Sequence, residues 1–130
     1  MSDSKTGDRL SIKVRSARRG DADAIARMAR ALSVSERGRR CGFSATAFLR
    51  DGFSDPPAFH TLVAEYDGLP AGYAVYYWGY DTDSATRGVY LADLYVDEIS
   101  RRRGVGTALM TGMACHIRDQ GGRWLFWSVL

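Results

Sequence analysis

Three strand-like segments that follow one another closely are the feature that most constrains how this chain can fold. Residues 59–66, 71–80 and 89–96 are rich in β-branched and aromatic residues. Asp67-Gly68, a dipeptide typical of tight hairpin turns, joins the first two segments, and a short polar loop separates the second from the third. Strands with such short connections pair antiparallel. We therefore expect an antiparallel meander at the centre of the molecule.

Helical patterns before and after the meander predict an α/β (α+β) fold. A short alternating strand at residues 12–16 precedes a helical pattern and a second short helix, which Ser44 would cap and Gly52 would end. After the meander, a helix over residues 105–120 leads to a final strand at 124–130. The expected order is β-α-α-β-β-β-α-β. It describes a central mixed, mostly antiparallel sheet flanked by helices, whose last strand–helix–strand unit crosses over right-handed.

Composition narrows the class of protein. The 130 residues, 45% hydrophobic and 25% charged, suit one globular domain, which we assign to residues 11–130 behind a flexible tail at residues 1–10. The opening residues are polar, and no apolar stretch approaches the roughly 20 residues of a membrane span. We expect no membrane partner. Two cysteines without close spacing favour a reducing cytoplasm and argue against a metal site.

The segment with the clearest signal for ligand binding joins the meander to the last helix. Its sequence is RRRGVGT, residues 101–107. The first turn of a helix leaves N–H groups without intrahelical acceptors, and the helix dipole adds positive potential there. Gly104 and Gly106 have no side chain to keep a ligand from those N–H groups, and three arginines add charge. We expect a phosphate-binding loop, although a two-glycine turn alone is as often purely structural.

The arrangement Arg101-x-x-Gly104-x-Gly106 after a strand resembles the acetyl-CoA signature of the GNAT superfamily of N-acetyltransferases. The order of elements is similar to that superfamily from the first strand to the fifth. YYWGYD at residues 76–81 and YLADLYV at 90–96 resemble in particular its diamine (spermidine/spermine-type) acetyltransferase branch. The resemblance implies an enzyme that transfers an acetyl group from acetyl-CoA directly to a primary amine of a small polyamine- or diamine-like molecule.

The resemblance also implies where the cosubstrate acetyl-CoA binds. Amides of the 101–107 loop would hold the pyrophosphate. The backbone of the third meander strand would pair with the pantetheine arm, provided that this strand splays from the last one. An amide near Leu94 would face the thioester oxygen. The residues expected to bind the cosubstrate are Leu94, Tyr95, Val96, Arg101, Arg102, Arg103, Gly104, Val105, Gly106 and Thr107.

One departure from the family pattern concerns the general base. The diamine branch usually carries a glutamate at the position of Ala92, and alanine cannot take a proton. Asp93 is adjacent, but regular alternation would turn it to the opposite face of the strand. Glu65 is a second candidate carboxylate. The catalytic acid and base therefore stay unassigned, with Asp93 and Glu65 as the candidates.

A second departure concerns length. Family members usually continue past the fifth strand into a further helix and two strands, and that helix usually supplies a tyrosine acid. This sequence ends at Leu130 without them. A truncated chain, a decayed gene and a domain completed by a partner are the alternatives. We expect a weak catalyst that still binds acetyl-CoA, and a homodimer formed through the uncovered last strand.

Aromatic residues of the second meander strand are candidates for amine recognition. Alternation places Tyr76, Trp78 and Tyr80 on one face and Tyr73 and Tyr77 on the other. One face must pack on helices, and the other is available as an aromatic wall for a cationic amine.

Three functions stay open on sequence grounds. The first is the N-acetyltransferase, and the second is a catalytically impaired CoA-binding domain with a structural or regulatory role. The third is a nucleic-acid-binding module that rests on the arginines at 37–40 and 101–103. A net charge of +3 permits an anionic ligand without requiring nucleic acid. The pattern shows no basic stripe on one element, so we expect no nucleic-acid partner.

Overall fold

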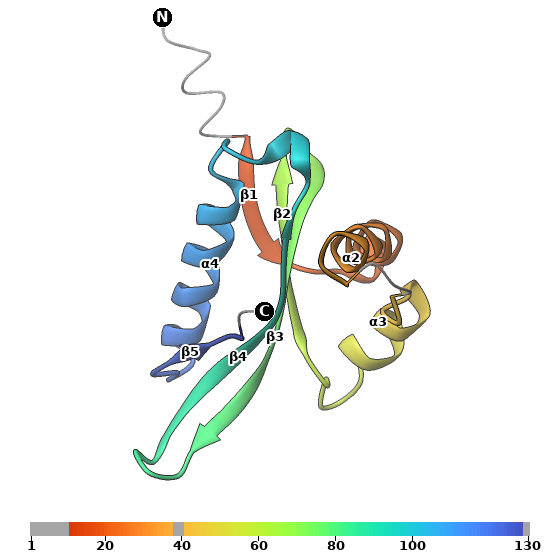
Figure 1. Cartoon of the computed structure of the whole chain (residues 1–130). Helices are drawn as coiled ribbons and strands as arrows, with labels where there is room; N and C mark the ends of the chain where they lie inside the picture. Colours follow the sequence, from red (N-terminus) through yellow and green to blue (C-terminus); the bar gives the residue numbers. More distant parts are fainter. Residues whose placement is uncertain (1–10, 38–40, 129–130) are drawn as a thin grey trace, which may run out of the picture.

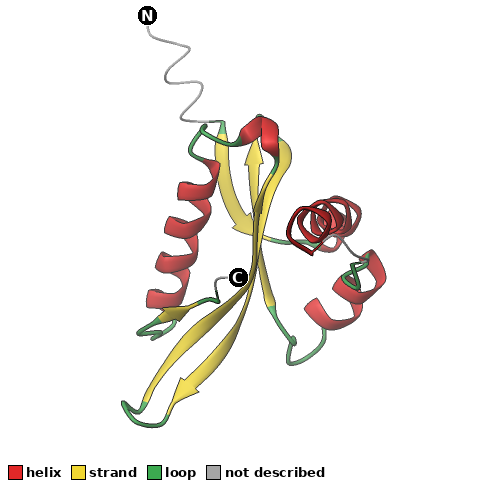
Figure 2. Ribbon diagram, viewed as in Figure 1, coloured by secondary structure: helices red, strands yellow, loops and turns green. Residues whose placement is uncertain are grey.

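A five-stranded sheet forms the middle layer of the structure, a computed structural model that describes residues 11–37 and 41–128. The strands lie in chain order, the first four antiparallel and the last parallel to its neighbour. The expected fold class and order of elements are confirmed (Figure 2). The expected tail at residues 1–10 lies outside the described residues. The strands are β1 (Ile12–Ser16), β2 (His60–Tyr66), β3 (Leu69–Asp81), β4 (Thr86–Val96) and β5 (Leu125–Phe126).

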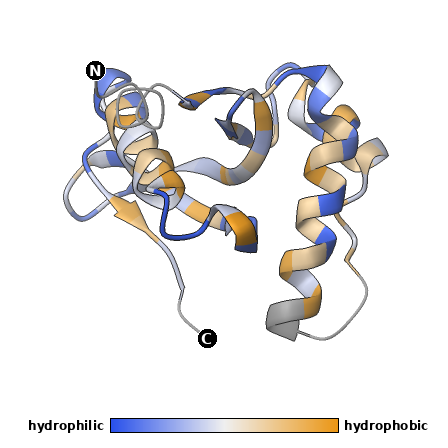
Figure 3. Cartoon of the chain, turned by 90° about the horizontal axis from the view of Figure 1, so that it is seen from above, coloured by the Kyte–Doolittle hydropathy of each residue, from blue (hydrophilic) through white to orange (hydrophobic). Residues whose placement is uncertain are grey.

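Helices cover both faces of the sheet. α2 (Ala22–Arg37) and α3 (Ala45–Gly52) lie on one face, and α4 (Val105–Asp119) lies on the other (Figure 1). Two 3-10 turns, η1 (Arg19–Asp21) and η2 (Glu98–Ser100), lead into α2 and towards α4. Seen from above, α2 and α4 stand apart with strands between them (Figure 3). None of the described helices is both long and apolar enough to cross a membrane.

Each face of the sheet builds its own hydrophobic core, because strand side chains alternate between the faces. The far end of the β3–β4 hairpin projects past the helices (Figure 1), and aromatic side chains there are exposed. The core under α4 contains Leu62, Ala74, Tyr76, Val89, Val105, Leu109, Met113 and Ile117. The core under α2 and α3 contains Ile25, Met28, Ala29, Phe48, Val63, Tyr73 and Val75.

Two short-range sequence signals, a hairpin turn and a helix cap, have the structural effects that the sequence predicts. Asp67 and Gly68 both have positive φ, 53° and 80°, as a type I′ hairpin turn requires. The Ser44 hydroxyl accepts a hydrogen bond from the Ala47 N–H at 3.1 Å and caps α3, which ends at Gly52. These features depend on a few adjacent residues, so the sequence alone predicts them.

The final strand is shorter than expected. Residues 124–130 were predicted to be a strand, but β5 contains only Leu125 and Phe126, which pair with Val89 and Tyr90. Residues 129–130 lie outside the described residues. The described ladder stops at Tyr90, next to the irregularity of β4 at residues 91–93.

Candidate functional site

A β-bulge in β4 shapes the site. Val75 of β3 pairs with Asp93, whereas the next residue, Tyr76, pairs with Leu91. Ala92 is therefore an extra residue without a partner in β3. A bulge of this kind bends the strand and increases its twist. Because β5 pairs with β4 only at Val89 and Tyr90, the described part of β5 leaves the edge of β4 beyond the bulge uncovered.

A cleft of about 270 Å³ opens where β4 and the chain after β5 separate. Leu32 of α2 and Met110 of α4 both line it, although these helices cover opposite faces of the sheet. The cleft therefore reaches both faces at the point where the strands splay. The remaining lining residues are Leu91, Ala92, Asp93, Leu94, Trp127 and Ser128.

The loop before α4 presents free amides. The first hydrogen bond of α4 joins the Ala108 N–H to the Gly104 carbonyl at 2.9 Å. The amides of residues 105–107 thus have no intrahelical acceptor. Arg102 and Gly104 have positive φ, 69° and 85°, which turns the chain sharply into the helix. Only η2 separates this loop from the end of β4 along the chain. The loop therefore follows the strand that borders the cleft.

The three arginines of this loop differ in their contacts. Arg101 donates from Nε to the Val96 carbonyl at 3.0 Å and lies over the Tyr95 ring. Arg103 donates to the Tyr66 hydroxyl at 2.8 Å and lies over that ring. Arg102 is exposed and has no described side-chain contact.

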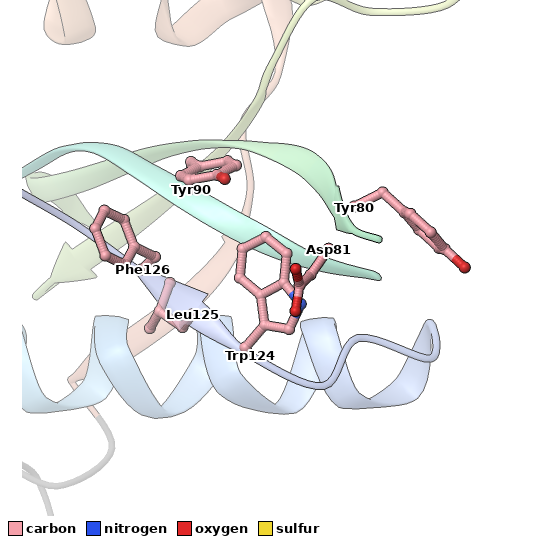
Figure 4. Close-up of a pocket in the computed structure, with 6 residues that line it drawn as sticks. All are labelled: Tyr80, Asp81, Tyr90, Trp124, Leu125 and Phe126. Carbon is pink, nitrogen blue, oxygen red and sulfur yellow. The ribbon is translucent and has the colours of Figure 1, made fainter. Parts of the chain in front are cut away.

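A second pocket, of about 340 Å³, lies at the far end of the β3–β4 hairpin (Figure 4). Its walls are aromatic: Tyr90 lies 5.3 Å from Trp124 and 5.8 Å from Phe126 between ring centroids, both edge-on. Asp81 lines the pocket with Trp124, while Tyr80 points away (Figure 4). The Trp124 Nε1–H is buried without a described acceptor. Aromatic rings and a carboxylate together suit a cation.

Asp81 is held in its charged form. The Ser84 hydroxyl donates to it at 2.7 Å, and the Asp83 N–H donates at 3.3 Å. The Ser84 hydrogen bond is the main reason why the pKa of Asp81 lies below its usual value.

The sequence predicts an aromatic wall from the residues of β3, but most of the residues that line this pocket are Tyr90 and residues 124–126. Such a combination depends on tertiary structure.

The two candidate carboxylates lie in different places. Asp93 lines the cleft together with Ala92. The bulge at Ala92 interrupts the regular alternation of β4, and the cleft reaches both faces of the sheet, so a position on the other face does not keep Asp93 out of it. Glu65 lies on β2, where its carboxylate pairs with Arg15 Nε at 2.7 Å, and it does not line the cleft. Within the described residues, no group of three or more His, Cys, Asp or Glu could hold a metal ion.

Solved structures share this architecture. An aminoglycoside acetyltransferase from an uncultured soil metagenomic sample superposes with a TM-score of 0.76 over 94% of this chain and 80% of its own, at 19% identity. A ribosomal-protein-alanine N-acetyltransferase from Brucella melitensis gives a TM-score of 0.74 over 92% and 80%, at 21% identity. The fold described above is therefore one that these two structures share.

The family follows from sequence. Residues 25–130 match the model of the acetyltransferase (GNAT) family. Thialysine N-epsilon-acetyltransferase of Sus scrofa is 35% identical over 120 residues, which are 85% of this chain and 70% of the relative. The Mus musculus counterpart is 37% identical over 113 residues, 80% and 66% of the two chains. The chain belongs to the GNAT family and is an acetyl-CoA-dependent N-acetyltransferase.

A further relative lies in the expected branch. The human spermidine/spermine N(1)-acetyltransferase-like protein 1 is 32% identical over 106 residues, 75% of this chain and 15% of that protein. Together with the thialysine enzymes, it confirms the resemblance to the diamine acetyltransferase branch.

Proposed function

We propose that this chain acetylates a primary amine of a small, cationic, polyamine- or diamine-like molecule by direct transfer from acetyl-CoA. The observation that carries the choice of substrate is the pocket formed by Asp81, Tyr90, Trp124 and Phe126. A polyamine carries several ammonium groups. One of them would lie against the rings and the carboxylate, and another would reach the cleft along the same strand. The names of the thialysine and spermidine/spermine relatives support this class of acceptor.

The residues that would hold acetyl-CoA fit such a ligand. Amides of residues 105–107 have no acceptor within α4 and would donate to the pyrophosphate, and exposed Arg102 adds charge. The uncovered edge of β4 at residues 94–96 offers backbone groups to the pantetheine arm, as a further strand would use them. The ten residues expected from the sequence, residues 94–96 and 101–107, belong to the end of β4, to the loop after η2 and to the first turn of α4, and Leu94 lines the cleft.

Groups of this chain would then position the thioester for attack by the amine. Acetyl-CoA supplies an activated acyl group as a thioester. Backbone amides of β4 near Leu94 lie at the cleft, where they would donate hydrogen bonds to the thioester oxygen and stabilise the charge that develops there. The apolar side chains of Leu32, Leu91 and Met110 line the same space and would displace water from it when the ligands bind.

Two measurements test this function. Calorimetric titration with acetyl-CoA measures binding, and release of the CoA thiol measures transfer to spermidine, short diamines and uncharged aromatic amines. We expect transfer to the polyamines and diamines at much higher kcat/KM than to the aromatic amines. Asp81→Asn should raise KM for spermidine about tenfold while the Kd of acetyl-CoA stays unchanged. The matched variant Asp119→Asn removes an exposed carboxylate that does not line the pocket, and it should behave as wild type.

Absence of acetyl-CoA binding would contradict the cosubstrate assignment. Equal activity on charged and uncharged amines would contradict the substrate class, and so would an unchanged spermidine KM in Asp81→Asn. Binding of acetyl-CoA without any turnover would favour the alternative, a CoA-binding domain without catalysis.

We further infer that residues 11–130 act as one domain in the cytoplasm and that the chain forms a homodimer, without nucleic-acid or membrane partners. Phe126 and Trp127, 57% and 49% exposed, support the dimer, because they leave apolar surface beside the last described strand. Sedimentation should show a dimer. A monomer at every concentration would contradict it.

A further inference from the structure

Asp93 is the one ionisable side chain among the described residues that line the cleft. The others are apolar except Ser128. A proton that leaves an amine in this space therefore has a single described carboxylate as its acceptor. Ala92, the exposed bulge residue next to it, has no side chain beyond a methyl group, so it leaves the space beside Asp93 open.

Asp93 directly follows the bulge residue Ala92. Asp93 pairs with Val75, on the face that α2 and α3 cover, whereas Leu91 and Leu94 pair with Tyr76 and Ala74 on the face that α4 covers. Because the cleft reaches both faces, Asp93 lines it from the side of α2.

Tyr73 holds the carboxylate in place. Its hydroxyl donates to Asp93 Oδ2 at 3.0 Å, and Tyr73 itself is fully buried in the core under α2. A carboxylate has about four lone-pair sites, and this hydrogen bond uses one. Oδ1 accepts no described hydrogen bond. The fixed orientation of the phenol thus leaves the second oxygen available to a substrate.

We infer that, given the proposed function, Asp93 is the catalytic proton acceptor and Tyr73 is the residue that positions it. The acceptor arrives as an ammonium ion, and one N–H proton passes to the Asp93 carboxylate. The freed lone pair forms the C–N bond to the acetyl carbon, and the C–S bond breaks. A second proton leaves the nitrogen, and the CoA thiolate takes one proton to become a thiol. The neutral Asp93 returns its proton to solvent, so charge and atoms balance.

The first test is Asp93→Asn. Asparagine has the same shape and still accepts a hydrogen bond from Tyr73, so the fold should be retained. At pH 7 we expect kcat with spermidine to fall about 10²-fold or more, because a base contributes at least that much. The Kd of acetyl-CoA and the melting temperature should match wild type. Asp119→Asn serves as the control, since it makes the same chemical change on an exposed side chain.

The pH dependence separates a proton acceptor from a structural role. As pH rises towards the pKa of the amine, more acceptor is already neutral, so the deficit of Asp93→Asn should shrink several-fold between about pH 7 and pH 9. A deficit that stays constant across this range would overturn the inference. Activity of Asp93→Asn within twofold of wild type at pH 7 would also overturn it.

Tyr73→Phe tests the positioning role. It should lower kcat several-fold without changing the Kd of acetyl-CoA. In the Asp93→Asn background it should have no further effect on kcat, because Tyr73 acts through the carboxylate. Equal effects in both backgrounds would overturn the assignment of Tyr73. If wild type neither binds acetyl-CoA nor acetylates any amine, the proposed function fails, whereas an active wild type with an active Asp93→Asn leaves that function standing and removes Asp93.

Discussion

A Cβ atom placed on Gly106 would lie 3.7 Å from Cγ2 of Val96, an ordinary van der Waals distance. The fold therefore has room for a side chain at this position, and glycine is a poor helix former. Gly104 is different, because its φ of 85° strains any other residue. A substitution at Gly106 can therefore test ligand binding without destabilising the fold, whereas a substitution at Gly104 cannot.

We predict that Gly106→Val folds as stably as wild type but binds acetyl-CoA at least tenfold more weakly, about 1.4 kcal/mol. The added methyl groups would keep the pyrophosphate from the amides of α4. Calorimetry and thermal denaturation measure the two effects. Gly20→Val is the matched control, because Gly20 has no atom within 4 Å of an added Cβ and lies outside the loop. Wild-type affinity in Gly106→Val would show that the loop does not hold the ligand.

The second prediction concerns salt. Acetyl-CoA affinity should fall as ionic strength rises, because salt screens exposed charges beyond about 10 Å at 0.1 M. Arg102 is exposed without a described contact, whereas Arg101 is bound to Val96. Arg102→Gln should therefore weaken binding several-fold at low salt and make it less sensitive to salt. Titrations at two salt concentrations measure this, and an affinity that salt does not change would point to the β4 edge as the dominant contact.

The third prediction concerns stability in acid. Asp21 is buried and accepts hydrogen bonds from Arg15 at 2.8 and 2.9 Å and from the Arg18 N–H at 2.6 Å. The Arg15 hydrogen bonds are the main reason why the pKa of Asp21 lies below its usual value. The ionised form thus stabilises the fold above about pH 4, and this stability is lost as pH falls through the lowered pKa.

Asp21→Asn should cost about 3 kcal/mol at pH 7, because it leaves partly buried Arg15 with Glu65 as its remaining carboxylate partner. Its unfolding free energy should also depend less on pH below about pH 4 than that of wild type. Urea unfolding across this range provides the measurement. A wild-type acid profile in Asp21→Asn would show that another group controls acid unfolding.

The fourth prediction concerns His60, which stacks on Tyr76 at 5.5 Å between ring centroids and shares a cavity with His116. Burial, and then the charge of His116, lower the pKa of His60. Above about pH 6.5 both the folded and the unfolded chain hold neutral His60, so stability is unaffected. Below it the unfolded chain takes up a proton that the folded chain resists, and stability falls. His60→Gln should weaken this dependence in urea unfolding between about pH 7.5 and pH 5.5, and an unchanged slope would contradict it.

The sequence by itself determined the order of strands and helices, the hairpin at Asp67-Gly68, the cap at Ser44 and the glycine loop before α4. Each of these depends on residues that are adjacent in the chain, so side-chain periodicity and backbone preference are sufficient to predict it. The acetyl-CoA signature belongs to the same kind of local pattern, which is why it identified the family.

Tertiary structure decided which residues line the cleft and the aromatic pocket. The bulge at Ala92 arises from the pairing of β4 with β3, and Asp93 beside it lines the cleft. The aromatic pocket forms because Gly79 and Gly88 have no side chains and let Trp124 pack closely against the hairpin. Pairing register and close packing join residues that are distant in the chain, and a single sequence does not specify which of them meet.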